Sequence, residues 1–110
     1  MKIIRNNIIP FKGFSAMNLF GFLFCRKNAV IGSVTINHES IHTAQMKEML
    51  YIPFYIWYGI EWLIRLVIYW NNHYAYRMIS FEQEAYANEQ DMQYLKNRKH
   101  YSWFNYIFSN

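Results

Sequence analysis

The chain has a single cysteine, Cys25, and therefore cannot form an internal disulfide. A reducing compartment fits this composition, although an exported protein without disulfides would look the same. The first thirteen residues contain no continuous apolar run, because Pro10 and Lys12 interrupt them, so no secretory signal is predicted. These features favour a cytoplasmic protein and leave membrane association open.

Charged residues are also scarce, at 16% of the chain, and the net charge is +4. Basic residues gather at Arg26-Lys27 and at residues 96–100, but aromatic residues do not alternate with them as a base-stacking platform requires. We therefore expect a solvated basic surface and no nucleic-acid partner. Apolar residues make up 54% and aromatics 21%, which indicates a folded chain. The many Tyr and Trp residues are typical of wet grooves, interfaces or membrane-facing surfaces.

We find no internal repeat, low-complexity tract or linker, so residues 1–110 are predicted to form one domain. Residues 1–36 favour strands. Short β-like pairs occur at Ile3-Ile4 and Ile8-Ile9, and residues 16–25 form the strongest strand, apolar on both faces, with Cys25 buried in it. Residues 29–34 are predicted as its partner strand, after a turn at 26–28.

Helices are predicted for most of the remaining chain. The first begins near Ser33 or Thr35, either of which can cap it, and Pro53 ends it or opens the next helix. A third helix runs from Ser80 to about residue 95, after a turn at 71–73, and a short last helix covers 102–108. The predicted fold is thus α+β, a small N-terminal sheet or hairpin packed on a bundle of three to four helices.

Residues 49–70 contain only two charges, Glu61 and Arg65, which are spaced for an i,i+4 ion pair. A helix of this length extends about 33 Å, enough to cross a bilayer. Its residues sort into an aliphatic stripe and a stripe with polar tips, however, so a helix buried on one side is the preferred interpretation. A transmembrane span is the alternative, and contact of residues 49–70 with a membrane surface stays open.

The most informative motif is H-E-x-x-H at residues 38–42. On a helix, His38 and His42 lie one turn apart on the same face and can occupy two corners of a tetrahedral zinc site. Glu39 lies beside them and can act as general base toward a water on the metal. The alternative is a helix carrying two solvated or core histidines.

A third ligand must come from elsewhere, and the helix predicted from Ser80 offers Glu82 and Glu84. These two carboxylates lie two residues apart and point to different faces, so they would not both reach one metal. Acidic residues in a first helical turn also complement the helix dipole, which is the structural explanation for one or both.

The motif at 38–42, followed by a glutamate on a later helix, resembles the gluzincin class of zinc metallopeptidases, and the compact plan is similar to the single-domain minigluzincins. In gluzincins the later helix reads E-x-x-x-D, and residues 84–88 fit that form with Asn88 in place of Asp. The resemblance therefore implies Glu84 as third zinc ligand, with Glu82 as the alternative, and Asn88 as hydrogen-bond partner of a ligating His. Gluzincins also use a His or Tyr to stabilise the oxyanion. The candidates here are His73, Tyr74, Tyr76 and Tyr86.

The resemblance implies a zinc-dependent hydrolase of peptide bonds that acts on a peptide or protein substrate, with one edge of the sheet receiving the peptide as an added strand. The alternative is a non-catalytic module in which zinc stabilises the fold and a partner binds the aromatic surface. A closed site with Glu82 or His73 as fourth ligand would indicate that alternative. The oligomeric state is not predicted.

Overall fold

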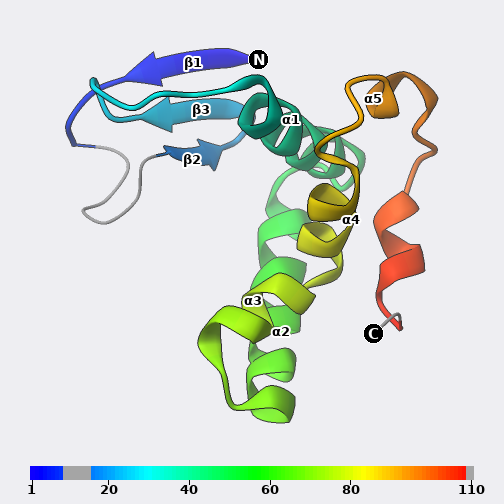
Figure 1. Cartoon of the computed structure of the whole chain (residues 1–110). Coiled ribbons are helices and arrows are strands. Elements are labelled where there is room, and N and C mark those ends of the chain that lie inside the picture. The colour runs from blue at the N-terminus through cyan, green and yellow to red at the C-terminus, as the bar shows by residue number, and fades with distance from the viewer. Residues whose placement is uncertain (9–15, 109–110) are drawn as a thin grey trace.

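The computed structural model of the chain describes residues 1–8 and 16–108 (Figure 1). In that part, three short strands at the N-terminus form one sheet, and five α-helices and a 3-10 helix follow. The predicted α+β class is confirmed, with the sheet at one end of the molecule beside the first helix. The helices outnumber the three or four expected because two short ones, α3 and α5, are separate elements.

The sheet consists of β1 (Lys2–Arg5), β2 (Ala16–Leu19) and β3 (Phe22–Cys25), in the order β1-β3-β2. The strand β3 pairs in parallel with β1 and antiparallel with β2. The single strand predicted for residues 16–25 is therefore a hairpin. Its two turn residues, Phe20 and Gly21, have φ angles of 53° and 92°, as in the type I′ turns that match the twist of paired strands. The backbone N–H of Phe20 donates to the Tyr55 hydroxyl (2.9 Å) and holds the turn against α2.

The other strand predictions have mixed outcomes. The Ile3-Ile4 pair lies in β1, whereas Ile8 is not in a strand and Ile9 lies outside the described residues. No strand forms over 29–34. The Arg5 guanidinium instead donates to the backbone carbonyls of residues 26, 27 and 29, at the turn that leads into this segment. Leu23 and Cys25 are buried under α1, as predicted for Cys25, but Phe22 is 43% exposed. The sheet is thus covered mainly on one face.

The helices are α1 (Ser33–Glu48), α2 (Ile52–Tyr69), α3 (Asn72–Met78), α4 (Ser80–Asn88), α5 (Tyr94–Asn97) and the 3-10 helix η1 (Ser102–Tyr106). Pro53 lies in the first turn of α2, where its missing N–H costs no hydrogen bond. The segment 71–73, predicted as a turn, instead opens α3. The backbone N–H of Tyr74 in this helix donates a hydrogen bond to the Asn71 side chain (2.9 Å). The helix predicted to run from Ser80 to residue 95 ends at Asn88.

The core lies around α4, which has α2 on one side and η1 on the other (Figure 1). Aromatic residues of α2 pack into it. Its fully or nearly buried members are Met46, Phe54, Ile79, Phe81 and Trp103. The predicted Glu61–Arg65 ion pair is confirmed at 3.2 Å, and it faces inward. Glu61 also accepts hydrogen bonds from the backbone and hydroxyl of Ser80, both at 2.6 Å, so it fixes the start of α4 relative to α2.

The aliphatic stripe of α2 lies on the opposite side and is exposed. Helix burial on one side was thus predicted correctly, but the buried side is the one with polar tips. Across the described residues, every helix falls short of the combined length and apolar character that crossing a bilayer requires.

Candidate metal site

The two histidines of the motif lie one turn apart on α1 and are both buried. Their Nε2 atoms converge on one oxygen of Glu82 in α4, at 3.3 Å from His38 and 3.1 Å from His42. Two ligand atoms bound to one tetrahedral zinc at 2.0–2.1 Å are about 3.3 Å apart. The separations in this cluster therefore fit a shared divalent ion.

The other ring nitrogen of each histidine is held by a hydrogen bond. Nδ1 of His38 lies 2.8 Å from Oε1 of Glu89, and Nδ1 of His42 lies 2.8 Å from Oε1 of Gln45. Because both partners are acceptors, each imidazole carries a proton on Nδ1, and Nε2 is then the nitrogen that can bind a metal. Such outer hydrogen bonds are typical of histidines that act as metal ligands.

The orientation of these partners is itself fixed. The Gln45 amide nitrogen donates to the Phe81 carbonyl and to Glu84, both at 3.0 Å, which turns its oxygen toward His42. Asn37, next to His38 on α1, donates to the backbone carbonyls of residues 88, 89 and 91. It thereby docks the end of α4 against α1 and brings Glu89 within reach of His38.

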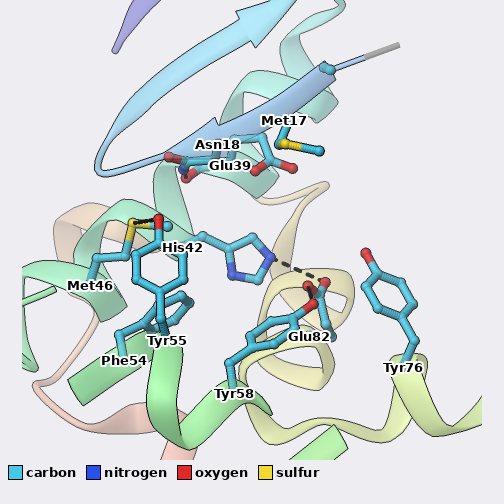
Figure 2. Close-up of a pocket in the computed structure, with 11 residues that line it drawn as sticks. Met17, Asn18, Glu39, His42, Met46, Phe54, Tyr55, Tyr58, Tyr76 and Glu82 are labelled. Atoms are coloured by element: carbon cyan, nitrogen blue, oxygen red, sulfur yellow. Dashed lines mark hydrogen bonds and ion pairs between the residues drawn. The ribbon is translucent and has the colours of Figure 1, made fainter. Parts of the chain in front are cut away.

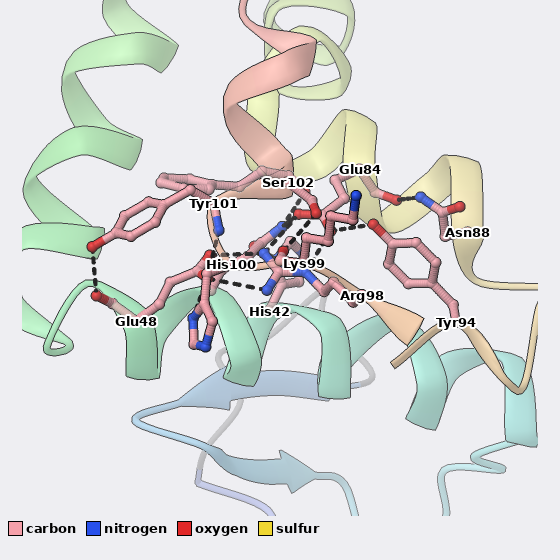
Figure 3. Close-up of polar contacts among 12 residues, drawn as sticks. His42, Glu48, Glu84, Asn88, Tyr94, Arg98, Lys99, His100, Tyr101 and Ser102 are labelled. Atoms are coloured by element: carbon pink, nitrogen blue, oxygen red, sulfur yellow. Dashed lines mark hydrogen bonds and ion pairs between the residues drawn. The ribbon is translucent and has the colours of Figure 1, made fainter. Parts of the chain in front are cut away.

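The position of Glu84 does not support the prediction that it is the third ligand. Figure 3 shows this side chain in a polar network with Arg98, whose guanidinium donates to both of its oxygens (2.6 and 3.1 Å). The Tyr94 hydroxyl donates to it as well, at 2.5 Å. Residues two apart on a helix are about 200° apart around its axis, so only one of the pair can reach the two histidines. Glu82, the alternative in the prediction, is that residue.

Asn88 is likewise not the partner of a ligating histidine. Its amide donates to the Glu84 carbonyl (2.8 Å) and the Tyr106 hydroxyl (3.3 Å). The role implied for it belongs to Glu89, which lies seven residues, or two helical turns, after Glu82 and so faces the same way. Glu89 brings a full charge to the imidazole, which Asn88 would not have done.

A cavity of about 230 Å³ opens beside the histidines, between β2 and α2 (Figure 2). The motif residues Glu39 and His42 form part of its wall, together with Glu82. Apolar and phenolic side chains supply most of the rest, namely Met17, Met46, Phe54, Tyr55, Tyr58 and Tyr76. Glu39 thus shares a small, largely apolar cavity with two of the proposed ligands, His42 and Glu82.

Two tyrosines contribute polar tips to this wall. The Tyr58 hydroxyl donates to Oε2 of Glu82 (2.7 Å), which leaves Oε1 directed at the histidines. Of the four oxyanion candidates, Tyr76 lines the cavity, and Figure 2 shows its hydroxyl pointing into the open space above Glu82. His73, Tyr74 and Tyr86 instead line another surface depression, and the Tyr86 ring packs edge-on against His38.

The charges of the cluster are strongly coupled. Burial alone would lower the pKa of His42, but the nearby Glu82 carboxylate and its hydrogen bond outweigh burial and raise that pKa to about 9. Burial in turn would raise the pKa of Glu82, but the charge of His42 and three hydrogen bonds hold it well below its usual range. Burial also raises the pKa of Glu39, with the histidine charges opposing the shift. Without metal, His42 and Glu82 therefore form a buried ion pair at neutral pH.

This ion pair predicts the pH dependence of metal uptake. Between pH 6.5 and 8.5 the apparent zinc affinity is expected to rise about tenfold per pH unit, because His42 must lose a proton before Nε2 can bind the ion. Competition titrations with a chromogenic chelator across this range measure it.

The stability of the metal-free protein should instead fall as the pH rises. Because the pKa of His42 is raised, the His42–Glu82 ion pair stabilises the fold fully below pH 6.5, and this stabilisation is lost as the pH rises through about 9. Thermal unfolding in excess chelator is the control. A zinc affinity that stays constant over the range would mean that His42 is already neutral in the metal-free protein.

No protein-family model, curated protein or solved structure matches the chain.

Sequence reasoning missed four residues of this site, although two carried a periodic signal. Gln45 follows His42 by three residues and Glu89 follows Glu82 by seven, so each shares a helix face with a proposed ligand. Tyr58 and Asn18 come from other elements. The Asn18 amide on β2 donates to the Glu39 carbonyl (2.8 Å) and fixes the strand against α1.

Proposed function

We propose that the chain is a metal-dependent peptidase, with zinc as the expected ion. The observation that carries the proposal is the convergence of both histidine Nε2 atoms on Oε1 of Glu82, with Glu39 in the wall of the adjoining cavity. Two imidazoles and one carboxylate are a donor set of catalytic zinc sites, which leave one position open. The same donors also suit iron, so the metal has to be identified by measurement.

In this proposal each residue has a separate task. A divalent ion at the site would act as a Lewis acid toward the scissile carbonyl and make a coordinated water more acidic. Glu39 accepts the proton of the attacking water and passes it to the leaving amine. Its carboxylate accepts no hydrogen bond from a side chain among the described residues, and burial raises its pKa, which makes it a stronger base than an exposed glutamate. Tyr76 is positioned to donate a hydrogen bond to the oxygen that gains charge.

The proposed substrate is an extended peptide. β2 is the outermost strand on its side of the sheet in the part of the chain that the structure describes, and its residues Met17 and Asn18 line the cavity. A peptide that pairs with a sheet edge receives its backbone hydrogen bonds from the strand and places alternate side chains on one face. One of those side chains would then enter the apolar cavity.

A second candidate is a non-catalytic module that metal stabilises. One observation favours it: ligand atoms of His38, Glu39 and His42 lie within 4.8 Å of one another, so Glu39 could complete a closed site together with Glu82. His73, the other candidate for a fourth ligand, lies in a different surface depression. The two functions therefore differ in whether Glu39 binds the metal or only faces it.

Metal content tests the proposal. Protein purified without added metal should carry close to one zinc per chain by mass spectrometry. His38→Ala and Glu82→Gln should lose it, because each removes one of three ligands.

Glu84→Gln is the matched control, since it changes a carboxylate two residues away that bonds to Arg98 instead. If Glu84→Gln loses the metal and Glu82→Gln keeps it, the ligand assignment fails. Wild type that takes up no metal, even when zinc is offered, would exclude the peptidase.

A further inference from the structure

Helix α2 exposes an apolar face over almost its whole length. Seven aliphatic side chains form this outer face, each between 54% and 70% exposed: Ile52, Ile56, Ile60, Leu63, Ile64, Val67 and Ile68. Scattered apolar residues on a surface are ordinary, but large contiguous apolar patches mark contacts with a partner or a membrane. The outer face is such a patch, so we expect it to contact a partner or a membrane.

The width of the outer face favours lipid over a single partner helix. At 100° per residue, its members cover an arc of about 160° around the helix axis. The stripe through which a helix packs against a protein core is about 100° wide or somewhat more, and the seam between two paired helices is narrower. A helix that lies in a membrane interface, by contrast, buries its whole apolar side in the headgroup and acyl boundary.

The charges of α2 point the same way. Glu61 and Arg65 are its only charged residues, and both turn away from the outer face and are buried, paired with each other. Arg65 also donates to the Ile107 carbonyl (2.6 Å). No charge therefore interrupts the outer face, while the net charge of +4 on the whole chain complements an anionic lipid surface.

Aromatic residues border the outer face, as they do in proteins at membrane interfaces. Trp57 is 39% exposed with its ring against Trp103, and Trp70, beyond the C-terminal end of α2, is 87% exposed. A groove of about 500 Å³ runs between α2 and the residues after η1. The buried ion pair of α2 contributes to its lining, and Ile107 and Phe108 lie on its far side. The groove widens the apolar surface beyond α2 itself.

We propose that the outer face of α2 docks on a lipid membrane, with the helix lying in the plane of the interface. The opposite side of the same helix supplies Phe54, Tyr55 and Tyr58 to the cavity at the metal site. Docking would hold that cavity roughly one helix diameter, about 10 Å, from the bilayer surface. The proposal does not depend on the peptidase function, because it rests on α2 alone.

Flotation of the full-length protein with vesicles tests the docking. Wild type should float with phosphatidylcholine vesicles, and more strongly when phosphatidylglycerol is included. The double variant Ile60→Gln/Ile64→Gln should partition at least tenfold less, since it places two polar side chains at the centre of the outer face. The matched control, Val30→Gln/Met92→Gln, changes two exposed apolar residues away from α2 and should float like wild type.

Quenching of tryptophan fluorescence by brominated lipid gives a second readout, which does not depend on the Ile60/Ile64 variant. Wild type should be quenched, and quenching should fall in the single variant Trp70→Phe, because Trp70 is 87% exposed at the end of the outer face. Several results would overturn the proposal: wild type that stays with the solvent, binding that the Ile60/Ile64 substitutions leave unchanged, or binding that salt abolishes. Wild type that forms a dimer which those substitutions dissociate, without floating, would assign the outer face to a second copy of the chain.

Discussion

Replacement of Glu39 by Gln is expected to leave the metal in place and to slow peptide hydrolysis by at least about a hundredfold. The amide has the size of the carboxylate but cannot accept the proton of the attacking water. Burial raises the pKa of Glu39, which makes the native carboxylate a stronger base than an exposed glutamate. Zinc per chain and initial rates on a fluorescence-quenched peptide library measure the two effects on the same preparation.

Glu89→Gln is the informative comparison, because Glu89 contacts the site through His38 and not through the cavity. The variant should bind zinc about tenfold to a hundredfold more weakly, as the loss of an outer hydrogen-bond partner does. At saturating zinc it should cleave peptides at the wild-type rate. If Glu39→Gln cleaves peptides as fast as wild type, Glu39 is not the base. If it loses the metal, Glu39 is a ligand, and the non-catalytic module becomes the better description.

The helix that carries the motif was predictable because its geometry is local. His38, His42 and Gln45 share one face of α1 whatever the rest of the fold does. The choice between Glu82 and Glu84 could not be made from local geometry, because it depends on the rotation of α4 about its own axis. That rotation is set by contacts from distant parts of the chain, notably Glu61 on Ser80 and Arg98 on Glu84. The gluzincin pattern fits residues 84–88, but in this structure Glu82 is the carboxylate that lies against the two histidines.

The faces of α2 were also predictable, but their roles were not. Aliphatic side chains usually point inward and tyrosines outward, because the hydroxyl keeps its hydration. Here the tyrosines point inward because their hydroxyls have specific partners, such as Glu82 for Tyr58 and the Phe20 backbone for Tyr55. Such partners cannot be read from one sequence, since they lie on other elements. The turn at Phe20-Gly21 was also missed, because apolar residues continue through it and the sequence therefore resembles one long strand.

Replacement of Arg98 by Met is expected to destabilise the protein by roughly 3–5 kcal/mol, the usual cost of leaving buried carboxylates without their cation. The Arg98 side chain is only 5% exposed and bridges Glu48 (2.7 and 3.1 Å) and Glu84 (2.6 and 3.1 Å), which are 2% and 0% exposed (Figure 3). The total free energy of unfolding of a domain is about 5–15 kcal/mol, so this loss is large, and Tm should fall by about 12 °C or more. Thermal and urea unfolding measure the loss.

Arg77→Met is the matched control, because Arg77 is exposed and its guanidinium lies 3.7 Å above the centre of the Tyr86 ring. An exposed contact of that kind is worth about 0.5–1 kcal/mol, so this variant should remain close to wild type. Adding Glu84→Gln to Arg98→Met should recover part of the loss, since it removes one of the two unpaired charges. Equal effects of Arg77→Met and Arg98→Met would mean that the buried charges are hydrated in solution. Because Gln45 joins Glu84 to His42, we expect Arg98→Met to weaken zinc binding as well, so the hydrogen bonds around Glu84 would also support the proposed ligands.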